Sequence, residues 1–329
     1  MSTDKKINIV VWGLGKHAIN NIIPAISRCK NTNTFGFFSR DKNIVKKSSE
    51  KYGGKSWGSS KEMLADQEID VVFLTTPPGL HYKQGTEILQ SRKNLWCDKP
   101  LTTSLEHTKD LINLSVNNNL SLCEGFMYLY HPQYRRLKEI LDSKILGEIK
   151  TIHCRLGAHW GKSSVDPGFR FKKNLGGSSL YDVGSYPLSL ISDLFNEEDF
   201  TIPFSNVIKE ESDPVDMNGI AVLETGGNIS CILEWANDKS YKNDIDIWGD
   251  NGSLHTEFIF SKKPEHQALI TLTDLYGNKT SETLKSSNHF ELMIESFSNM
   301  LENPKKIVNE KDRILRVAKL LDRVEKESK

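Results

Sequence analysis

The stretch "INIVVWGLGKHAIN", residues 7–20, places a glycine turn directly after a short apolar run and before a helix-like segment. Its G-x-G-x-x-A pattern consists of Gly13, Gly15 and Ala18. Glycine permits a tight turn and a close backbone approach, and the N–H groups that open the next helix can bind a pyrophosphate. An ordinary glycine turn is the alternative. The residues expected to bind a dinucleotide here are Gly13, Leu14, Gly15, Lys16 and His17.

The rest of the N-terminal third repeats the same alternation of apolar runs and amphipathic segments. The runs do not alternate apolar with polar residues, as is typical of strands covered on both faces. We therefore predict an α/β fold that begins with a doubly wound parallel sheet, a Rossmann domain over residues 1–124. The further strands are expected in "TFGFFS" (34–39), "IDVVFLTT" (69–76), "NLWCD" (94–98) and "LSLCEGF" (120–126).

From about residue 149 the pattern changes to that of an antiparallel sheet. "GIAVLETGGNISCILEWA" (219–236) and "IDIWGDNGSLHTEF" (245–258) each resemble two strands joined by a tight turn, the second around Asn251-Gly252. Residues 175–195, 288–301 and 311–324 have helical periodicity. Residues 125–329 are thus predicted to form an α+β domain with a large, mostly antiparallel sheet, used for substrate binding and oligomerisation.

Composition narrows the class of protein. The 43 basic and 43 acidic residues cancel, so a nucleic-acid or anionic-membrane partner is not indicated. No apolar stretch is long enough for a membrane helix or a signal peptide, and we expect a cytoplasmic protein. The five scattered cysteines lack C-x-x-C spacing, so neither a metal site nor a disulfide framework is predicted.

The residues after the second strand bear on the choice of cofactor. An acid at this place binds the ribose 2′-hydroxyl of NAD, whereas an arginine suits the 2′-phosphate of NADP. Here Ser39 and Arg40 come first and Asp41 follows. NADP(H) is therefore favoured and NAD(H) remains possible, because a shift of one residue would bring Asp41 into the binding position.

Together these segments resemble the glucose-fructose oxidoreductase / inositol dehydrogenase (Gfo/Idh/MocA) family of two-domain sugar dehydrogenases over nearly the full chain. Many relatives have histidine where this chain has Tyr186, and in this the sequence resembles the branch that contains glucose-fructose oxidoreductase, dihydrodiol dehydrogenase and nucleotide-sugar 3-ketoreductases. The motifs that carry the resemblance are "GLGKHA" (13–18), "TTPPGLH" (75–81), "DKP" (98–100), "EGFMYLYHP" (124–132), "LGEIKTI" (146–152) and "FRFKKNLGGSSLYDVGSY" (169–186).

The resemblance implies roles for individual residues. Lys99 is expected to contact the nicotinamide ribose and the reacting sugar oxygen, next to Asp98, which replaces the usual glutamate. The alternative role for His81 is to cap a helix, and the alternative for Arg170 is a surface ion pair. The remaining cofactor residues implied are Thr75, Thr76, Pro77, His81 and Asp98, and the implied substrate-binding residues are Tyr128, Arg170 and Asp182.

The implied reaction is hydride transfer between nicotinamide and a sugar carbinol or ketone, which requires a proton donor or acceptor at the oxygen. Lys99 and Tyr186 are the predicted catalytic pair, although Tyr186 could instead be a packing residue. The substrate implied is a nucleotide-linked hexose, with C3 as the candidate carbon, in surface-polysaccharide or deoxy- or amino-sugar biosynthesis. Alternatives are a dehydrogenase of free sugars, inositols or diols, and a non-catalytic NAD(P)-binding regulator.

A homo-oligomer, dimer or tetramer, is also expected. One face of the second sheet must cover helices, and alternation leaves the other face without a cover. We predict that this open face carries Ile229, Cys231 and Leu233 or their neighbours.

Overall fold

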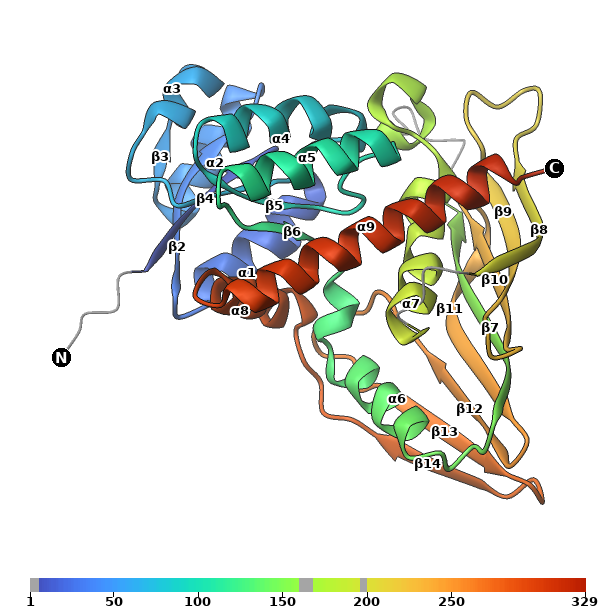
Figure 1. Cartoon of the computed structure of the whole chain (residues 1–329). Coiled ribbons are helices and arrows are strands. Elements are labelled where there is room, and N and C mark those ends of the chain that lie inside the picture. The colour runs from blue at the N-terminus through green and yellow to red at the C-terminus, as the bar shows by residue number, and fades with distance from the viewer. Residues whose placement is uncertain (1–5, 160–167, 196–199) are drawn as a thin grey trace. The chain divides into compact units, whose positions relative to one another are not determined.

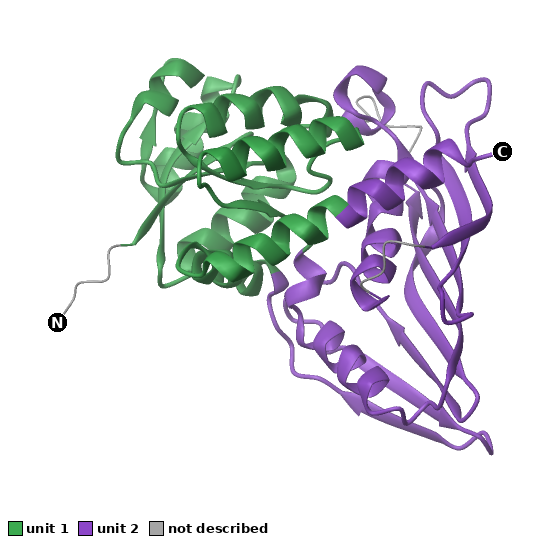
Figure 2. Cartoon of the chain, in the orientation of Figure 1, with its two compact units in different colours: residues 1–126, 290–315 green, residues 127–289, 316–329 purple. Residues whose placement is uncertain are grey.

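The computed structural model describes residues 6–159, 168–195 and 200–329, which divide into two compact units (Figure 2). Unit 1 comprises residues 1–126 and 290–315, and unit 2 comprises residues 127–289 and 316–329. These two units differ from the predicted domains 1–124 and 125–329, because residues 290–315 pack with unit 1. The predicted domain boundaries stay a prediction. For example, the Phe297 ring lies 5.4 Å from that of Trp96.

Unit 1 contains a six-stranded parallel sheet in the order β3-β2-β1-β4-β5-β6, so the predicted Rossmann fold is confirmed (Figure 1). Its strands are β1 (Ile7–Trp12), β2 (Thr32–Phe38), β3 (Lys55–Ser56), β4 (Val71–Leu74), β5 (Asn94–Cys97) and β6 (Leu122–Glu124). Its helices are α1 (Ile23–Arg28), α2 (Lys42–Tyr52), α3 (Ser60–Ala65), α4 (His81–Gln90), α5 (Leu105–Asn117), nearly all of α8 (His289–Leu301) and the first half of α9 (Pro304–Lys326).

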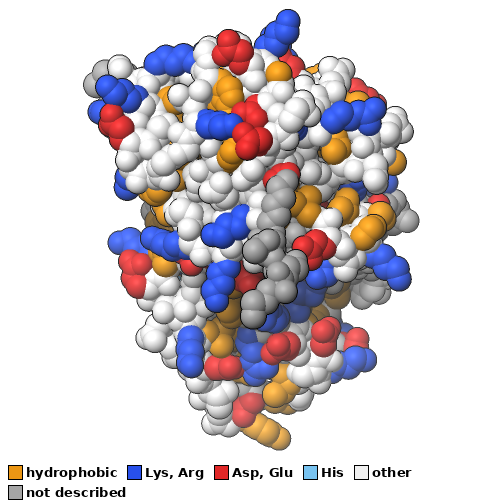
Figure 3. All heavy atoms as spheres, turned by 90° about the vertical axis from the view of Figure 1, so that its left-hand side faces the viewer, with side chains coloured by type: hydrophobic (Ala, Val, Ile, Leu, Met, Phe, Trp, Pro, Cys, Tyr) orange, Lys and Arg blue, Asp and Glu red, His pale blue; other side chains and the backbone are white. Residues whose placement is uncertain are grey.

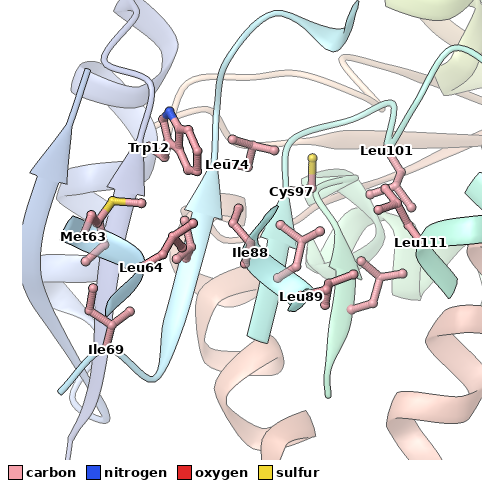
Figure 4. Packing of buried hydrophobic residues seen from close by; sticks show 14 of the residues in the cluster. Trp12, Met63, Leu64, Ile69, Leu74, Ile88, Leu89, Cys97, Leu101 and Leu111 are labelled. Atoms are coloured by element: carbon pink, nitrogen blue, oxygen red, sulfur yellow. The ribbon is translucent and has the colours of Figure 1, made fainter. Parts of the chain in front are cut away.

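The central strands show no alternation of apolar and polar residues, because both of their faces are covered. All four residues of β4 are buried, as are the last four of β1. Figure 4 shows one of the resulting cores, in which Trp12, Leu74 and Cys97 from three neighbouring strands lie near Ile88 and Leu89 of α4. The carboxyl ends of β1, β4 and β5 are thereby fixed relative to one another within unit 1.

Unit 2 contains an eight-stranded sheet in the order β14-β13-β12-β11-β7-β10-β9-β8, antiparallel except for the pair β7 and β10. The mostly antiparallel sheet is thus confirmed. Its strands are β7 (Ile149–His159), β8 (Thr201–Ile208), β9 (Asn218–Glu224), β10 (Ser230–Ala236), β11 (Asp238–Gly249), β12 (Gly252–Glu257), β13 (Leu269–Asp274) and β14 (Lys279–Thr283). Its helices are α6 (Pro132–Asp142), α7 (Ser185–Phe195) and the second half of α9.

The predicted turns and helices of unit 2 occur, with small shifts. Gly226 and Gly227 lie in the turn between β9 and β10. The turn between β11 and β12 lies at Asp250 and Asn251, one residue earlier than predicted, because Gly252 already pairs with β13. The helical run that includes α7 opens with a π-helical turn, Leu180–Gly184.

Of the two alternatives predicted for the open sheet face, the structure has the second, the neighbours of Cys231 and Leu233. Cys231 and Leu233 themselves have no exposed surface, because they point to the covered face, and Ile229 precedes β10. Ile232 and Glu234 alternate with them and are partly exposed, since successive residues of a strand point to opposite faces. The opposite face carries a charge network: Nε2 of His153 lies 2.8 Å from Glu234, Arg155 contacts Asp244 and Asp246 at 2.7 and 3.1 Å, and Nδ1 of His255 lies 2.7 Å from Asp246.

One face of the molecule carries side chains of both charges. On the face shown in Figure 3, Lys and Arg side chains are interspersed with Asp and Glu. Among the described helices, none combines the length and the apolar composition needed to cross a bilayer.

Candidate active site

The phosphate loop after β1 has the geometry that its motif predicts. Gly13 has φ +104°, and a Cβ on it would lie 2.8 Å from backbone atoms of Thr75 and Thr76, so only glycine fits. A Cβ on Gly15 would meet no atom within 4 Å. Residues 16–28 then form one helical run, with a π-helical turn at Ala18–Ile22. The loop therefore offers open space beside Gly15 in front of free helical N–H groups, which fits a pyrophosphate.

At the end of β2, Arg40 is exposed and Asp41 has a structural role. The Asp41 carboxylate caps α2 by accepting hydrogen bonds from the N–H groups of Asn43 and Ile44, at 2.9 and 3.3 Å. An N-cap carboxylate is held by the helix and contributes to its stability. Arg40, beside Ser39, is exposed and could bind a 2′-phosphate.

The loops that follow β4 and β5 are joined by a buried histidine. The His81 ring is 1% exposed, and its Nε2 lies 2.7 Å from the Thr76 carbonyl and its Nδ1 3.0 Å from the Pro100 carbonyl. Burial lowers the pKa of His81. His81 thus positions the two loops. It begins α4 without capping it, and a direct contact with a cofactor stays a prediction that its burial does not favour.

Asp98 links the loop after β5 to the phosphate loop. Its Oδ1 accepts the N–H of Lys99 at 3.0 Å, and its Oδ2 lies 3.5 Å from Nε2 of His17. The Asp98 N–H in turn donates to the Leu74 carbonyl at the end of β4. Unit 1 therefore brings Gly13, His17, Asp98 and the backbone of Lys99 to one edge of the parallel sheet, where α/β folds of this kind bind ligands.

A buried carboxylate behind this edge was missed by the sequence analysis. Glu124, at the end of β6, is 3% exposed and accepts the N–H of Leu101 at 2.7 Å. Arg313 of α9 lies 3.7 Å from Glu124 Oε2 and also pairs with Glu310 at 2.6 Å. Burial raises the pKa of Glu124 to about 7, against the opposing effects of Arg313 and Lys99. An acid at the end of an apolar strand, within "EGFMYLYHP", was the available signal.

Tyr186 lies in an aromatic cluster of unit 2. Its hydroxyl is 3.6 Å from the Met127 sulfur, and its ring lies 6.1 Å from Tyr128 and 5.5 Å from Phe260. Tyr128 has no exposed surface, and its hydroxyl is 2.7 Å from that of Ser189. Tyr128 thus supports the packing of Tyr186, and its contact with substrate stays a prediction that its burial does not favour.

Arg170 and Asp182 form an ion pair within unit 2. Arg170 Nε donates to Asp182 Oδ2 at 2.5 Å, and the guanidinium lies 5.0 Å from the Phe169 ring centre. Asp182 is buried and Arg170 is partly exposed. The ion pair that was the alternative for Arg170 is therefore present, and a contact of either residue with substrate stays a prediction.

Two family models match the chain. The oxidoreductase family with an NAD-binding Rossmann fold, GFO_IDH_MocA, matches residues 7–126, and the GFO/IDH/MocA C-terminal domain matches residues 134–255. Together the two matches cover most of the chain.

Individual relatives match over similar lengths. A dTDP-3,4-didehydro-2,6-dideoxy-alpha-D-glucose 3-reductase from Actinomadura kijaniata is 25% identical over 325 residues, 97% of this chain and 94% of that protein. The enzyme of the same name from Saccharopolyspora spinosa is 25% identical over 268 residues, 82% and 80% of the two chains. A crystal structure of a 3-ketoreductase from A. kijaniata with NADP and TDP-benzene has the same fold, with a TM-score of 0.93 at 24% identity over 99% and 98% of the two chains.

The open space at Gly15 leads to the first prediction. Gly15→Ala should leave the free energy of unfolding nearly unchanged but weaken NAD(P)H binding by about tenfold or more, since the methyl group would occupy the space that a pyrophosphate needs. Fluorescence titration and urea unfolding would measure both. Gly226→Ala, which also has open space, is the control and should change neither. Unchanged affinity in Gly15→Ala would contradict the phosphate loop.

The raised pKa of Glu124 predicts a pH-dependent stability. The unfolded chain ionises this group near pH 4.5, whereas the folded chain keeps its proton until about pH 7. The preference of the folded chain for protonated Glu124 therefore stabilises the protein fully below pH 4.5, and this stabilisation is lost as pH rises to 7. The free energy of unfolding changes by about 3 kcal/mol over this range. Urea unfolding between pH 5 and 7 should show this decline in the wild type relative to Glu124→Gln. The exposed Glu302→Gln is the control, and parallel curves for wild type and Glu124→Gln would refute the assignment.

Proposed function

Because this chain belongs to the GFO/IDH/MocA oxidoreductase family, we propose that it is an NADP-dependent reductase of a keto group, with C3 as the candidate carbon, on a nucleotide-linked deoxyhexose. The observation that carries the proposal is the alignment over 97% of the chain with a dTDP-didehydro-dideoxyglucose 3-reductase. The solved neighbour with NADP and TDP-benzene supports the same cofactor and substrate class.

The cofactor site is proposed to be built from unit 1. The open space at Gly15 would take the pyrophosphate, and Arg40 would pair with the 2′-phosphate in a charge-assisted hydrogen bond. Thr75, Thr76 and Pro77 would lie along the nicotinamide ribose, with their loop held by His81. When bound, NADPH supplies the hydride.

The protein's own part in the reaction is to deliver a proton to the oxygen of the keto group. Tyr186 can donate a proton from its hydroxyl, which lies 3.6 Å from the Met127 sulfur. Lys99 can stabilise the resulting tyrosinate by its charge, or donate a proton itself. The charge of Lys99 opposes the rise in the pKa of Glu124. Lys99 therefore has a nearby group of opposite charge when Glu124 is ionised.

The decisive test is an assay of NADPH oxidation with a TDP-linked 3-keto-deoxyhexose, compared with free sugars, inositols and diols. Turnover of the nucleotide-linked ketone at the highest kcat/KM supports the proposal. Higher kcat/KM with the free compounds would favour the second class of dehydrogenase, and cofactor binding without any turnover would favour a regulator. A homo-oligomer and a cytoplasmic location stay predictions.

Arg40 should determine the preference for NADPH. Loss of a charge-assisted hydrogen bond in Arg40→Ala should weaken NADPH binding by about tenfold to a hundredfold and leave NADH binding nearly unchanged. Fluorescence titration with both cofactors measures this. Lys47→Ala, which removes an exposed charge from α2, is the control. Equal losses for NADPH and NADH would show that Arg40 does not read the 2′-phosphate.

Lys99 and Tyr186 should act as one unit in catalysis. Lys99→Ala and Tyr186→Phe should each lower kcat by about 10²–10⁴-fold, and the double variant should be far less than multiplicatively worse. Tyr181→Phe is the matched control, because the Tyr181 hydroxyl donates to Glu325 at 2.8 Å and should affect stability alone. Near-normal kcat in Tyr186→Phe would return Tyr186 to a packing role and leave Lys99 as the only acid/base.

A further inference from the structure

Unit 2 holds a strained aromatic residue just after β12. Phe258 has φ +54°, a left-handed conformation that a bulky residue adopts only where its surroundings hold it there. The side chain and backbone of buried Asn243 do so: the Asn243 carbonyl accepts the N–H of Phe258 at 2.5 Å, and its amide accepts from Phe260 at 3.0 Å and donates to the Ser261 carbonyl at 2.8 Å. Backbone strain of this kind tends to occur at functional sites.

The strained conformation places Phe258 between two other rings. Its ring centre lies 5.8 Å from that of Tyr241 and 4.6 Å from that of His266. The Tyr241 hydroxyl accepts from the Asn243 amide at 3.0 Å, although the residue is 54% exposed. We call Tyr241, Phe258 and His266 the ring platform. Tyr241 is exposed and Phe258 and His266 are partly exposed, so the ring platform offers flat aromatic surface on which a planar ligand can stack.

Positive charge lies beside the ring platform. Lys262 is 9% exposed, and its ammonium donates to the Ile259 carbonyl at 3.2 Å. In the part of the chain that the structure describes, no carboxylate forms an ion pair with Lys262. Burial lowers the pKa of Lys262 to about 7. Burial and then the charge of Lys262 lower the pKa values of His131 and His266, while Glu257 raises that of His266. A bound anion would stabilise the charged form of Lys262.

The same segment reaches the proposed catalytic tyrosine. Phe260, two residues after Phe258, has its ring 5.5 Å from that of Tyr186. Tyr241 shares a sheet face with Asn243, which is buried, and that face is opposite to the charge network of Arg155 and Asp244. The ring platform therefore lies on the same face of the sheet as Asn243, opposite to the charge network, at a place where Tyr241 is still exposed.

We propose that the ring platform and Lys262 bind the nucleoside diphosphate part of the substrate, with the base stacked on Tyr241 and Phe258 and the diphosphate beside Lys262. The inference rests on the proposed function. Stacking of a base on an aromatic side chain strengthens binding whatever the base, and lysine ammonium groups commonly bind phosphate. A free sugar offers neither a flat aromatic face nor a negative charge, so it would use neither feature.

Calorimetric titration with thymidine diphosphate alone tests the inference without requiring turnover. Tyr241→Ala, Phe258→Gly and Lys262→Gln should each weaken binding by about tenfold or more, and should raise KM for the nucleotide-linked ketone while kcat changes little. Glycine at 258 accepts φ +54° without strain, so this variant removes the ring and keeps the backbone. Phe258→Tyr keeps the ring and should bind like the wild type.

The matched controls lie in the β13–β14 hairpin of the same unit. Tyr276→Ala removes a tyrosine that is 88% exposed, and Lys279→Gln removes an exposed lysine; both should bind thymidine diphosphate like the wild type. Thermal unfolding identifies any variant that fails to fold, in which case Phe258→Gly against Phe258→Tyr decides.

The outcomes separate this inference from the proposed function. Weakened binding in the three variants supports the inference, even if no ketone is reduced, in which case the proposed function alone fails. Wild-type affinity in Tyr241→Ala and Phe258→Gly, or no binding of thymidine diphosphate at all, overturns it. Inorganic phosphate that binds as tightly as thymidine diphosphate would also overturn it, because the rings would then contribute nothing.

Discussion

The close contact between the turn after β1 and the loop after β4 is the constraint on which the proposed cofactor site depends. Gly13 meets the backbone of Thr75 and Thr76 at a distance that admits no side chain, and the Thr75 N–H donates to the Trp12 carbonyl at 2.9 Å. This contact exists because β1 and β4 are paired neighbours with fully buried residues. The helix that follows the turn is thereby fixed beside the loops that carry Thr76, Asp98 and Lys99.

In unit 2 a tryptophan plays a comparable part. Trp235 of β10 lies so close to Gly184 and Gly219 that a Cβ on either glycine would approach its ring to 2.9 and 2.3 Å. The missing side chain of Gly184 thus lets the helical run that carries Tyr186 lie directly on Trp235 of the sheet. A larger residue at either glycine would move that run or the ring, and in a close-packed interior neither movement is free of cost.

Local patterns in the sequence were enough to predict the two sheets and the glycine turn after β1, because each depends on residues close together in the chain. The alternatives left open and the omissions have a common cause. The parity of β10 depends on which face the helices cover, and the burial of Tyr128 depends on Phe260, so neither is encoded locally. The pairing of Glu124 with Arg313 joins residues 189 positions apart, which no local pattern can reveal.

That long-range pair also has a consequence for the order in which the protein is made. Unit 1 needs residues from α9, so it cannot be completed when its sheet has emerged from the ribosome. At about 5–20 residues per second, synthesis of the 189 residues from Glu124 to Arg313 takes roughly 10–40 s. During that interval the nascent Rossmann sheet ends in a carboxylate whose guanidinium partner has not yet been translated, and all eight strands of unit 2 are made before it arrives.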